Sequence, residues 1–288
     1  MNETTVGSIH TIAIVCNPLA GSGRAVALAD KISGVLIRKK IPHQVFKEEW
    51  PDEFDGFSDV WIVGGDGTLN YFINRYPETK MPFVIFKGGS GNDMHWLLYG
   101  DKSFDQQIEY VLPAAARPVD AGRCNEKLFI NGVGVGFEGA VAESVAGKKK
   151  SAGKASFYIG VLQKILFYRS GTYRIETEEF NCRKKYLMIS ISNGRRAGGG
   201  FYIAPVARVD DGLLDVTLID PIPPLVRLRW LPVIEKGKHL HLPVVSHFTT
   251  KKILIESDQV LQLHLDGEIY KNRKLEIEIL PARFLFRY

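Results

Sequence analysis

The sequence predicts two domains: an α/β domain with a mostly parallel sheet over residues 1–120, and a mainly antiparallel β-sandwich with inserted helices over residues 121–288. Up to residue 120, apolar strand-like runs alternate with segments of helical periodicity, the order that builds parallel sheets. After residue 120, short β-rich runs follow one another between Gly and Asp turns. A length of 288 residues is enough for two domains that each bury a core.

The elements of the first half follow from their apolar patterns. Residues 12–16, 60–63 and 83–86 are unbroken apolar runs, as expected for buried parallel strands. Between and after these strands, helical faces are formed by Leu28, Ile32, Val35 and Leu36, and by Leu69, Phe72, Ile73 and Tyr76. Right-handed crossovers place the strand-to-helix loops of such a sheet along one edge, where ligands bind.

The second half contains mainly strands. Expected strands are 127–133, 172–176, 186–192, 214–219, 252–256, 260–265 and 275–279. Two helices interrupt them, 155–168 and 225–236, and the second follows the helix-breaking stretch "PIPP".

Composition places the chain among ordinary globular proteins, with 45% hydrophobic and 24% charged residues. No apolar run approaches the roughly 20 residues of a membrane span, and the N-terminus lacks the features of a signal peptide, so we expect a cytoplasmic protein. Cys16, Cys124 and Cys182 are far apart and odd in number, which argues for packing rather than disulfides or zinc. The net charge of +5 weakly favours anionic partners such as nucleotides or acidic lipids.

Each expected strand of the first half leads into a loop of small residues: "NPLAGSGRA" from Asn17, "GGDGTLN" from Gly64, and "GGSGND" from Gly88. Glycines let main-chain N–H groups converge, and each loop opens a helix whose N-terminus favours an anion. None is a P-loop, because the Gly-Lys-Ser/Thr ending is missing. One such loop alone is best interpreted as a tight turn, but three at successive strand ends favour a nucleotide.

The carboxylate of Asp66 stands among these amides, where it would repel phosphate unless a cation lay between them. Mg²⁺, which takes one or two carboxylates and keeps several waters, is the usual mediator. Asp93 and Asp120 end the next loop and strand, so three carboxylates are expected at this edge. The alternatives are that Asp93 is a helix first-turn acid and Asp120 a turn residue.

Two further patterns are set aside. "GVGVGFEG" contains G-x-G-x-x-G at Gly134, Gly136 and Gly139, but it lies in the β-rich half, outside a βαβ unit, so a dinucleotide site is disfavoured. His239 and His241 are interpreted as a surface pair because neither a cysteine nor a third histidine lies near them.

Six stretches in order carry a resemblance: "NPLAGSG", "GGDGTLN", "GSGND", "NGVGVGFEGAV", "NGRRAGGGFYIAPVARVDDGLLDV" and "HLDGEIY". From Ile14 to about Phe286 the sequence resembles the diacylglycerol kinase catalytic superfamily, specifically its small bacterial lipid kinases. The resemblance implies a nucleotide domain similar to that of NAD kinases and phosphofructokinases, followed by a β-sandwich domain for the lipid, with ATP in the cleft between them.

The resemblance also implies roles for individual residues. Glu268, supported by Asp266, is the expected base that receives the lipid hydroxyl proton, and Asp66 is expected to take part in catalysis through an aspartate, water and Mg²⁺ network with Asp93 and Asp120. A second, structural Mg²⁺ is expected at Asp211 and the carbonyls near Arg208 and Leu213. The expected ATP contacts are Asn17, Gly64, Gly65, Asp66, Gly67, Thr68, Leu69, Asn70, Ser90, Gly91 and Asn92.

Propensity alone favours a hairpin turn for "DGE", since Asp-Gly is a common turn pair. The sequence also departs from the family: Tyr71 stands where a Glu is frequent, Ser90 replaces a Thr, and Glu138 replaces an Asp. These changes bear on nucleotide preference and substrate identity.

The resulting hypothesis is an ATP- and Mg²⁺-dependent lipid kinase that associates peripherally with membranes, and no nucleic-acid partner is expected. Residues 148–169 combine basic and aromatic side chains, which suits an anionic membrane surface, although apolar residues on almost every face favour burial instead. Two alternatives stay open: an NAD kinase, and a catalytically silent nucleotide- or lipid-binding module. The lipid acceptor is not readable from the sequence, and the oligomeric state, including a homodimer, is left open.

Overall fold

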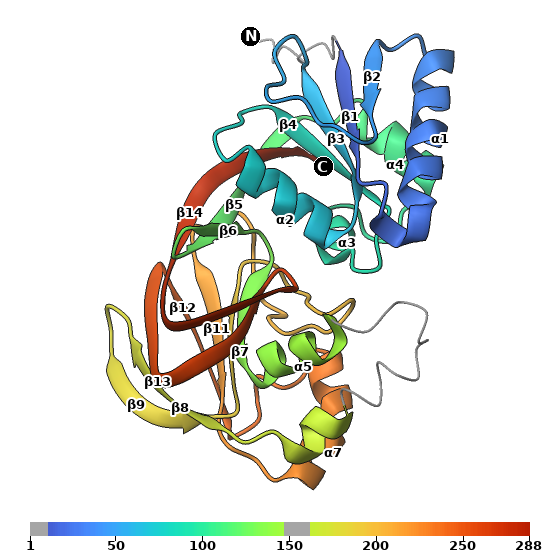
Figure 1. Ribbon diagram of the computed structural model, residues 1–288. Coiled ribbons are helices and arrows are strands. Elements are labelled where there is room, and N and C mark those ends of the chain that lie inside the picture. The colour runs from blue at the N-terminus through green and yellow to red at the C-terminus, as the bar shows by residue number, and fades with distance from the viewer. Residues whose placement is uncertain (1–10, 147–161) are drawn as a thin grey trace. The chain divides into compact units, whose positions relative to one another are not determined.

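The computed structural model describes residues 11–146 and 162–288, and the chain divides into two compact units (Figure 1). Unit 1 consists of Met1–Val119 and Ala282–Tyr288, and unit 2 of Asp120–Pro281. The division therefore falls within two strands, β5 (Ala116–Cys124) and β14 (Glu268–Arg287). Residues 282–288, placed in the second domain from the sequence, group with unit 1.

Unit 1 is built on a parallel sheet in the order β14-β4-β3-β1-β2. β1 (Ile12–Cys16) and β3 (Asp59–Gly64) are buried along their whole length, as their continuous apolar runs require. β2 (His43–Phe46) lies at one edge of this order, and β4 (Pro82–Lys87) pairs with β3 and with the end of β14.

The described part of unit 1 contains the α-helices α1 (Arg24–Arg38), α2 (Asp66–Arg75), α3 (Asp93–Tyr99) and α4 (Phe104–Val111). The buried face of α1 repeats at helical spacing, with Ala25, Ala29, Ile32 and Leu36 inaccessible to solvent. α4 begins with a capping box, in which Ser103 and Gln106 bond each other's backbone N–H groups.

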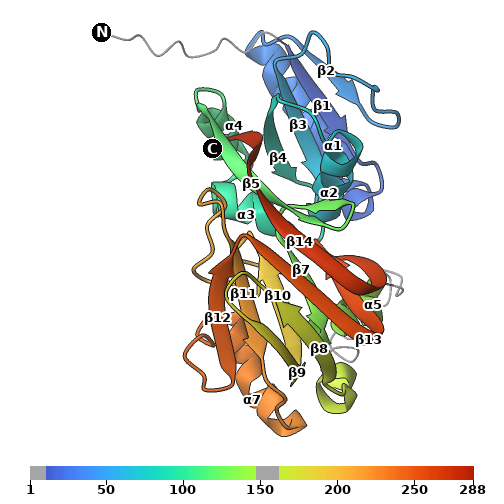
Figure 2. The ribbon, with the colours of Figure 1, turned by 90° about the vertical axis from the view of Figure 1, so that its left-hand side faces the viewer.

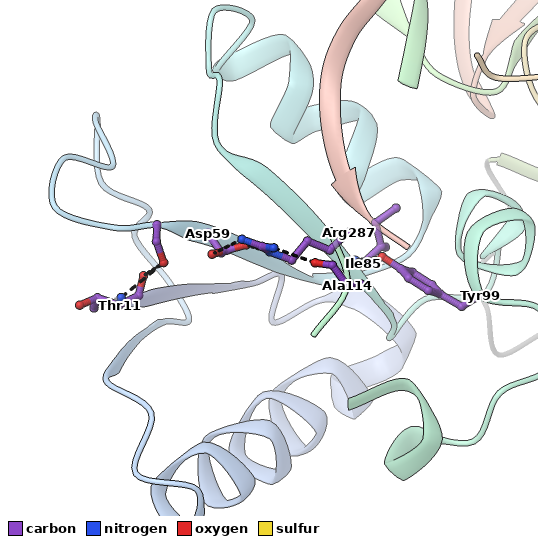
Figure 3. Close-up of polar contacts among 7 residues, drawn as sticks. Thr11, Asp59, Ile85, Tyr99, Ala114 and Arg287 are labelled. Atoms are coloured by element: carbon purple, nitrogen blue, oxygen red, sulfur yellow. Dashed lines mark hydrogen bonds and ion pairs between the residues drawn. The ribbon is translucent and has the colours of Figure 1, made fainter. Parts of the chain in front are cut away.

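The last residues of the chain join unit 1 through packing and charge. Phe83 of β4 contacts Phe284 and Phe286, with ring centroids 5.6 and 5.2 Å apart. Next to them, the Arg287 guanidinium donates to both oxygens of the fully buried Asp59 carboxylate and to the Ala114 carbonyl (Figure 3). These contacts explain why residues 282–288 belong with the parallel sheet.

Unit 2 is antiparallel, with strands in the order β12-β11-β10-β7-β13-β14, as Figure 2 shows. β8 and β9 form a hairpin on β13, and β6 pairs with β5. The strands are β6 (Lys127–Phe129), β7 (Gly132–Gly136), β8 (Gly171–Glu176), β9 (Asn181–Tyr186), β10 (Met188–Ser192), β11 (Leu214–Ile219), β12 (Val245–Thr250) and β13 (Lys252–Leu265). The predicted strands 252–256 and 260–265 form one strand, interrupted by a register shift.

Unit 2 also contains the helices α5 (Phe137–Ala146) and α7 (Pro224–Glu235). α7 confirms the predicted helix. α5 was not predicted, because its mostly small apolar residues do not form a distinct helical stripe. Of the predicted helix 155–168, residues 162–167 are helical and residues 155–161 lie outside the described residues, as does the basic stretch 148–150. Among the described residues, no helix has the length and apolar character needed to cross a bilayer.

The interpretation of His239 as a surface residue is wrong. Its ring is fully buried in unit 2, and Nε2 lies 3.0 Å from the Ile203 carbonyl oxygen. Cys16 and Cys124 are buried free thiols, as expected of packing residues, and burial raises their pKa to about 11 and about 12.

Candidate active site

The three glycine loops of unit 1 meet at the carboxyl ends of β1, β3 and β4. The Gly88 N–H donates to the Gly64 carbonyl at 2.8 Å, and the Asp66 N–H donates to the Gly91 carbonyl at 3.1 Å. Asn17 Nδ2 reaches Thr68 Oγ1 at 3.2 Å and so joins the first loop to the second. The loops predicted from separate stretches of sequence thus form one continuous surface.

The glycines are required because these loops touch through their backbones. A Cβ atom added at Gly65 would lie 2.6 Å from the Gly91 carbonyl oxygen, and one at Gly89 would lie 2.4 Å from the Gly65 Cα. In the first loop, Gly21 has φ 58° and a Cβ there would lie 2.2 Å from the Gly88 oxygen. A side chain at any of these positions would push two loops apart.

Asp66, the first residue of α2, holds the third loop in place. Its Oδ2 accepts the Asp93 N–H at 2.9 Å and its Oδ1 accepts the Met94 N–H at 3.2 Å, so the carboxylate caps the start of α3. The side chain remains partly exposed. Asp66 therefore has a structural task and still presents negative charge at the surface of the loops.

The expected ATP contacts differ in accessibility. Thr68 is buried, and the side chain of Leu69 lies in the hydrophobic core, so Leu69 can offer a ligand only its backbone. The Asn70 carbonyl accepts from Asn74 Nδ2 at 2.9 Å. Gly64 and Gly65 are buried, whereas the exposed and half-buried members of the set are Asn17, Asp66, Gly67, Ser90, Gly91 and Asn92.

Tyr71, one of the three departures from the family pattern, lies on α2 one turn beyond Thr68. Its side chain is 55% exposed. The ring meets Trp50 edge-on at 5.5 Å between centroids, and its hydroxyl accepts from Arg75 Nη1 at 3.2 Å. Trp50 Nε1 in turn donates to the Cys16 carbonyl at the end of β1. A partly exposed aromatic ring, in contact with Trp50 and Arg75, thus lies beside the glycine loops.

In unit 2, Asp266 and Gly267 form the two-residue turn between β13 and β14, with Leu265 paired to Glu268. Both turn residues have positive φ, 49° and 93°, which identifies a type I′ hairpin. The Asp266 carboxylate accepts three N–H groups, from Ile130 at 2.8 Å and from Asn131 and Gly132 at 2.9 Å. The hairpin interpretation is confirmed, and the same Asp anchors a distant segment.

Glu268, the expected base, follows this turn with an exposed side chain. Two carboxylates therefore stand close together at one end of the hairpin. Burial raises the pKa of the neighbouring Tyr270 phenol, and the charges of Glu268 and Asp266 raise it further. The environment of Glu268 is thus negative and open to solvent.

Sequence reasoning missed Asn193, which joins several motif stretches of unit 2. Its Nδ2 donates to the carbonyls of Asp120 at 3.0 Å and Ile130 at 2.8 Å, and its own N–H donates to the Asn131 carbonyl. The available signal was the Asn-Gly pair, which occurs directly after β10 at 193–194 and again at 131–132, where Gly132 begins β7. A buried Asn with two backbone partners fixes the geometry of both segments.

The expected metal ligands lie in both units. Asp66 and Asp93 belong to unit 1, whereas Asp120, Arg208, Asp211 and Leu213 belong to unit 2. There, Asp120 Oδ2 accepts the Gly212 N–H at 2.7 Å, and Asp211 Oδ1 accepts the Leu213 N–H at 3.1 Å. Within residues 11–146 and 162–288, no group of three or more His, Cys, Asp or Glu side chains is arranged to hold a metal.

This donor set fits only one kind of magnesium binding. Mg²⁺ held by one or two carboxylates, with phosphates and water filling the other positions, needs no protein cage. The partly exposed carboxylate of Asp66, at the edge of the glycine loops, suits that arrangement.

Comparison with known proteins assigns the chain to a family. Residues 11–124 match the model of the diacylglycerol kinase catalytic domain. Residues 131–285, more than half of the chain, match the model described as the YegS C-terminal NAD kinase beta sandwich-like domain. The chain belongs to the YegS-like lipid kinases.

Relatives of this lipid kinase family cover most of the chain. A Pseudomonas aeruginosa (strain UCBPP-PA14) protein named "Probable lipid kinase YegS-like" is 31% identical, over 79% of this chain and 75% of its own length. A Mycobacterium tuberculosis (strain ATCC 25618 / H37Rv) protein named diacylglycerol kinase is 28% identical, over 95% of this chain and 94% of its own.

A crystal structure of a diacylglycerol kinase from Bacillus anthracis str. Sterne shares the fold. Its TM-score is 0.73 at 18% identity, covering 98% of this chain and 97% of that one. The likeness confirms the predicted fold class, an α/β unit with mostly parallel strands followed by an antiparallel β-sandwich.

Proposed function

We propose that this lipid kinase transfers the γ-phosphoryl group of ATP, with Mg²⁺, to the hydroxyl of a lipid alcohol such as diacylglycerol. The observation that carries the proposal is the convergence of the three glycine loops of unit 1, locked together by Asp66, within a diacylglycerol kinase catalytic domain. Phosphoryl transfer depends on positioning and on compensation of phosphate charge, and these loops are suited to both.

ATP would bind along the loops of unit 1. The exposed Ser90 hydroxyl is a donor suited to phosphate oxygens, and the partial positive charge at the start of α2 favours an anion there. Because the glycine backbones are packed against one another, this surface is formed before the ligand arrives. The half-buried residues Asn17, Gly67, Gly91 and Asn92 are the proposed contacts beside it.

Within unit 1, Mg²⁺ would be held at Asp66 with Asp93 as a further carboxylate. Asp120, in unit 2, stays a proposed ligand on the sequence resemblance alone. When bound, the ion would neutralise charge on the phosphate oxygens. Asp66 would then have two tasks, capping α3 and orienting the ion, which explains why an acid stands among phosphate-binding amides. The second ion, at Asp211, Arg208 and Leu213, stays a proposal for the loop that Asp120 also contacts.

Glu268 is the proposed base. Its carboxylate is exposed and can accept the proton of a lipid hydroxyl as the new P–O bond forms. Asp266 is better suited to holding the turn, because its carboxylate already accepts three backbone N–H groups. The turn then fixes where Glu268 lies.

Glu268→Gln tests the proposal, because the exposed side chain can lose its charge without disturbing the fold. We expect transfer of ³²P from ATP to extracted membrane lipids to fall about 10²- to 10⁴-fold, the usual contribution of a general base. Glu276→Gln, an exposed glutamate of the same strand, is the matched control and should stay active.

Three outcomes separate the alternatives. Full activity of Glu268→Gln would show that Glu268 is not the catalytic base. Product formed with NAD, and not with lipids, identifies an NAD kinase. ATP binding without a labelled product across the lipid panel identifies a silent binding module. The labelled lipid itself would name the acceptor.

Membrane association is part of the proposal, since the substrate resides in a bilayer. The basic stretch Lys148–Lys150 lies outside the described residues and is tested in solution. Co-sedimentation with anionic vesicles should weaken when all three lysines are replaced with glutamate. Unchanged binding would place the docking surface elsewhere.

A further inference from the structure

A buried histidine and a glutamate lie directly behind the turn that carries Glu268. His264 is on β13, two residues before Asp266, and its side chain is 9% exposed. Its Nε2 lies 3.2 Å from Oε1 of Glu138, in the first turn of α5, whose side chain is 14% exposed. Burying two ionisable side chains lowers the stability of the fold unless they are paired with each other.

The glycine motif "GVGVG" provides the space for this pair. Gly134 lies on β7 directly opposite His264. A Cβ atom at Gly134 would lie 2.4 Å from both Glu138 Cδ and His264 Nε2. Gly134, part of the G-x-G-x-x-G pattern that is not a dinucleotide site, therefore has a packing role: it leaves the space in which Glu138 and His264 meet.

The other ring nitrogen of His264 contacts the turn itself. The Gly267 N–H donates to Nδ1 at 3.3 Å, so Nδ1 carries no proton in this arrangement. The proton of the neutral ring is then on Nε2, the nitrogen that faces Glu138. A chain of contacts runs from Glu138 through the His264 ring to the backbone amide of Gly267, the residue next to Glu268.

The turn is thus fixed from two sides. On one side the Asp266 carboxylate accepts three amides of residues 130–132, and on the other His264 accepts the amide of Gly267. The second Glu138 oxygen, Oε2, is buried and finds no hydrogen-bond partner among the described residues. Glu138 is therefore placed at some cost to stability, as expected when a residue serves a site.

We propose that Glu138 and His264 are positioning residues that hold the Asp266–Gly267 turn, and with it the Glu268 carboxylate, in the geometry needed to meet a lipid hydroxyl. This inference rests on the proposed function. Neither side chain touches the substrate; each acts through the turn. A displacement of about 1 Å at a catalytic group is enough to cost on the order of 10²-fold in rate.

Two substitutions at His264 separate positioning from bulk. His264→Asn keeps an acceptor near the position of Nδ1, whereas His264→Leu fills similar space and removes it. We expect His264→Leu to lower kcat for lipid phosphorylation about 10- to 100-fold with KM for ATP unchanged, and His264→Asn to recover most of the loss. Glu138→Gln should lower kcat less than His264→Leu.

A second measurement reports on the turn without any activity. Hydrogen exchange of the Gly267 amide should accelerate in His264→Leu and return towards wild type in His264→Asn. His239→Leu is the matched control: it also removes a buried histidine of unit 2, one that contacts Ile203 and not the turn. It should lower stability while leaving the Gly267 amide and kcat unchanged.

The results decide the inference separately from the proposed function. If wild type phosphorylates no lipid, the proposed function fails, whatever the exchange data show. If wild type is active but His264→Leu keeps its kcat, or keeps the exchange rate of Gly267, the positioning role is refuted. Equal loss of kcat in His264→Leu and His239→Leu would also refute it, since general destabilisation would then explain both.

Discussion

The buried ion pair between Asp59 and Arg287 allows a quantitative prediction. Asp59 has no solvent exposure and the Arg287 side chain is 10% exposed. Arg287 Nη2 reaches Asp59 Oδ2 at 3.3 Å, Nε donates to Oδ1, and Nη1 donates to the Ala114 carbonyl at 2.8 Å. The pair is formed by residues 228 positions apart, so it ties the chain terminus to β3.

The perturbation is Arg287→Met, which keeps the length of the side chain and removes its charge. It leaves the Asp59 carboxylate buried without its cation, and breaking a buried pair in this way costs about 3 to 5 kcal/mol. That loss is a large part of the roughly 5 to 15 kcal/mol that stabilises a typical domain. Adding Asp59→Leu should recover much of it, because the uncompensated charge is then gone.

Urea unfolding followed by tryptophan fluorescence can report on unit 1 alone. Trp50, Trp61 and Trp96 are in unit 1, and the fourth tryptophan, Trp230, is in unit 2. Trp230→Phe therefore serves as the background for all variants. The midpoint of the transition and its slope give the change in the free energy of unfolding.

Lys47→Met is the matched control within unit 1, because Lys47 pairs with Asp30 at 2.6 Å while the two side chains are exposed, at 40% and 57%. Its removal should cost less than about 1 kcal/mol. The reasoning is refuted if Arg287→Met costs no more than Lys47→Met, or if the double variant is less stable than Arg287→Met alone.

Two further predictions concern the loops and the response to acid. Gly89→Ala should abolish ATP binding in calorimetric titration, because the new Cβ would lie 2.4 Å from the Gly65 Cα. The control, Gly34→Ala on α1, should leave ATP binding intact. Retained ATP binding in Gly89→Ala would show that the loops need not touch. Burial lowers the pKa of His95 below the ordinary 6.5, so as pH falls the unfolded chain binds a proton before the folded chain does. The free energy of unfolding therefore falls as pH drops below about 6.5, by up to about 1.4 kcal/mol per pH unit. Urea midpoints between pH 7.5 and 5.5 should therefore decline less in His95→Gln, and an identical decline would assign the acid sensitivity to other groups, such as the buried His239.

Much of the fold could be predicted from local patterns. Continuous apolar runs indicated β1, β3 and β4, because a strand buried on both faces has apolar side chains at consecutive positions. Helical spacing indicated α1 and α2, because a helix buries one stripe of side chains three or four positions apart. The same holds for the glycine loops, whose small residues are consecutive. α5 was missed because its sequence, "FEGAVAESVA", is rich in small apolar residues and includes a glycine, so its apolar and polar positions do not separate into two helical faces.

What the sequence by itself determined is therefore the kind of elements, their order, and the small-residue loops at the strand ends. Only the tertiary structure decided that Asp66 caps a helix that begins 27 residues later, that Asp266 anchors a segment about 135 residues earlier, and that His264 meets Glu138 across Gly134. It also decided that the last seven residues belong to unit 1. The physical reason is that periodicity and turn propensity act between neighbours in the chain, whereas hydrogen bonds and ion pairs between distant residues depend on packing and leave no mark in the local sequence.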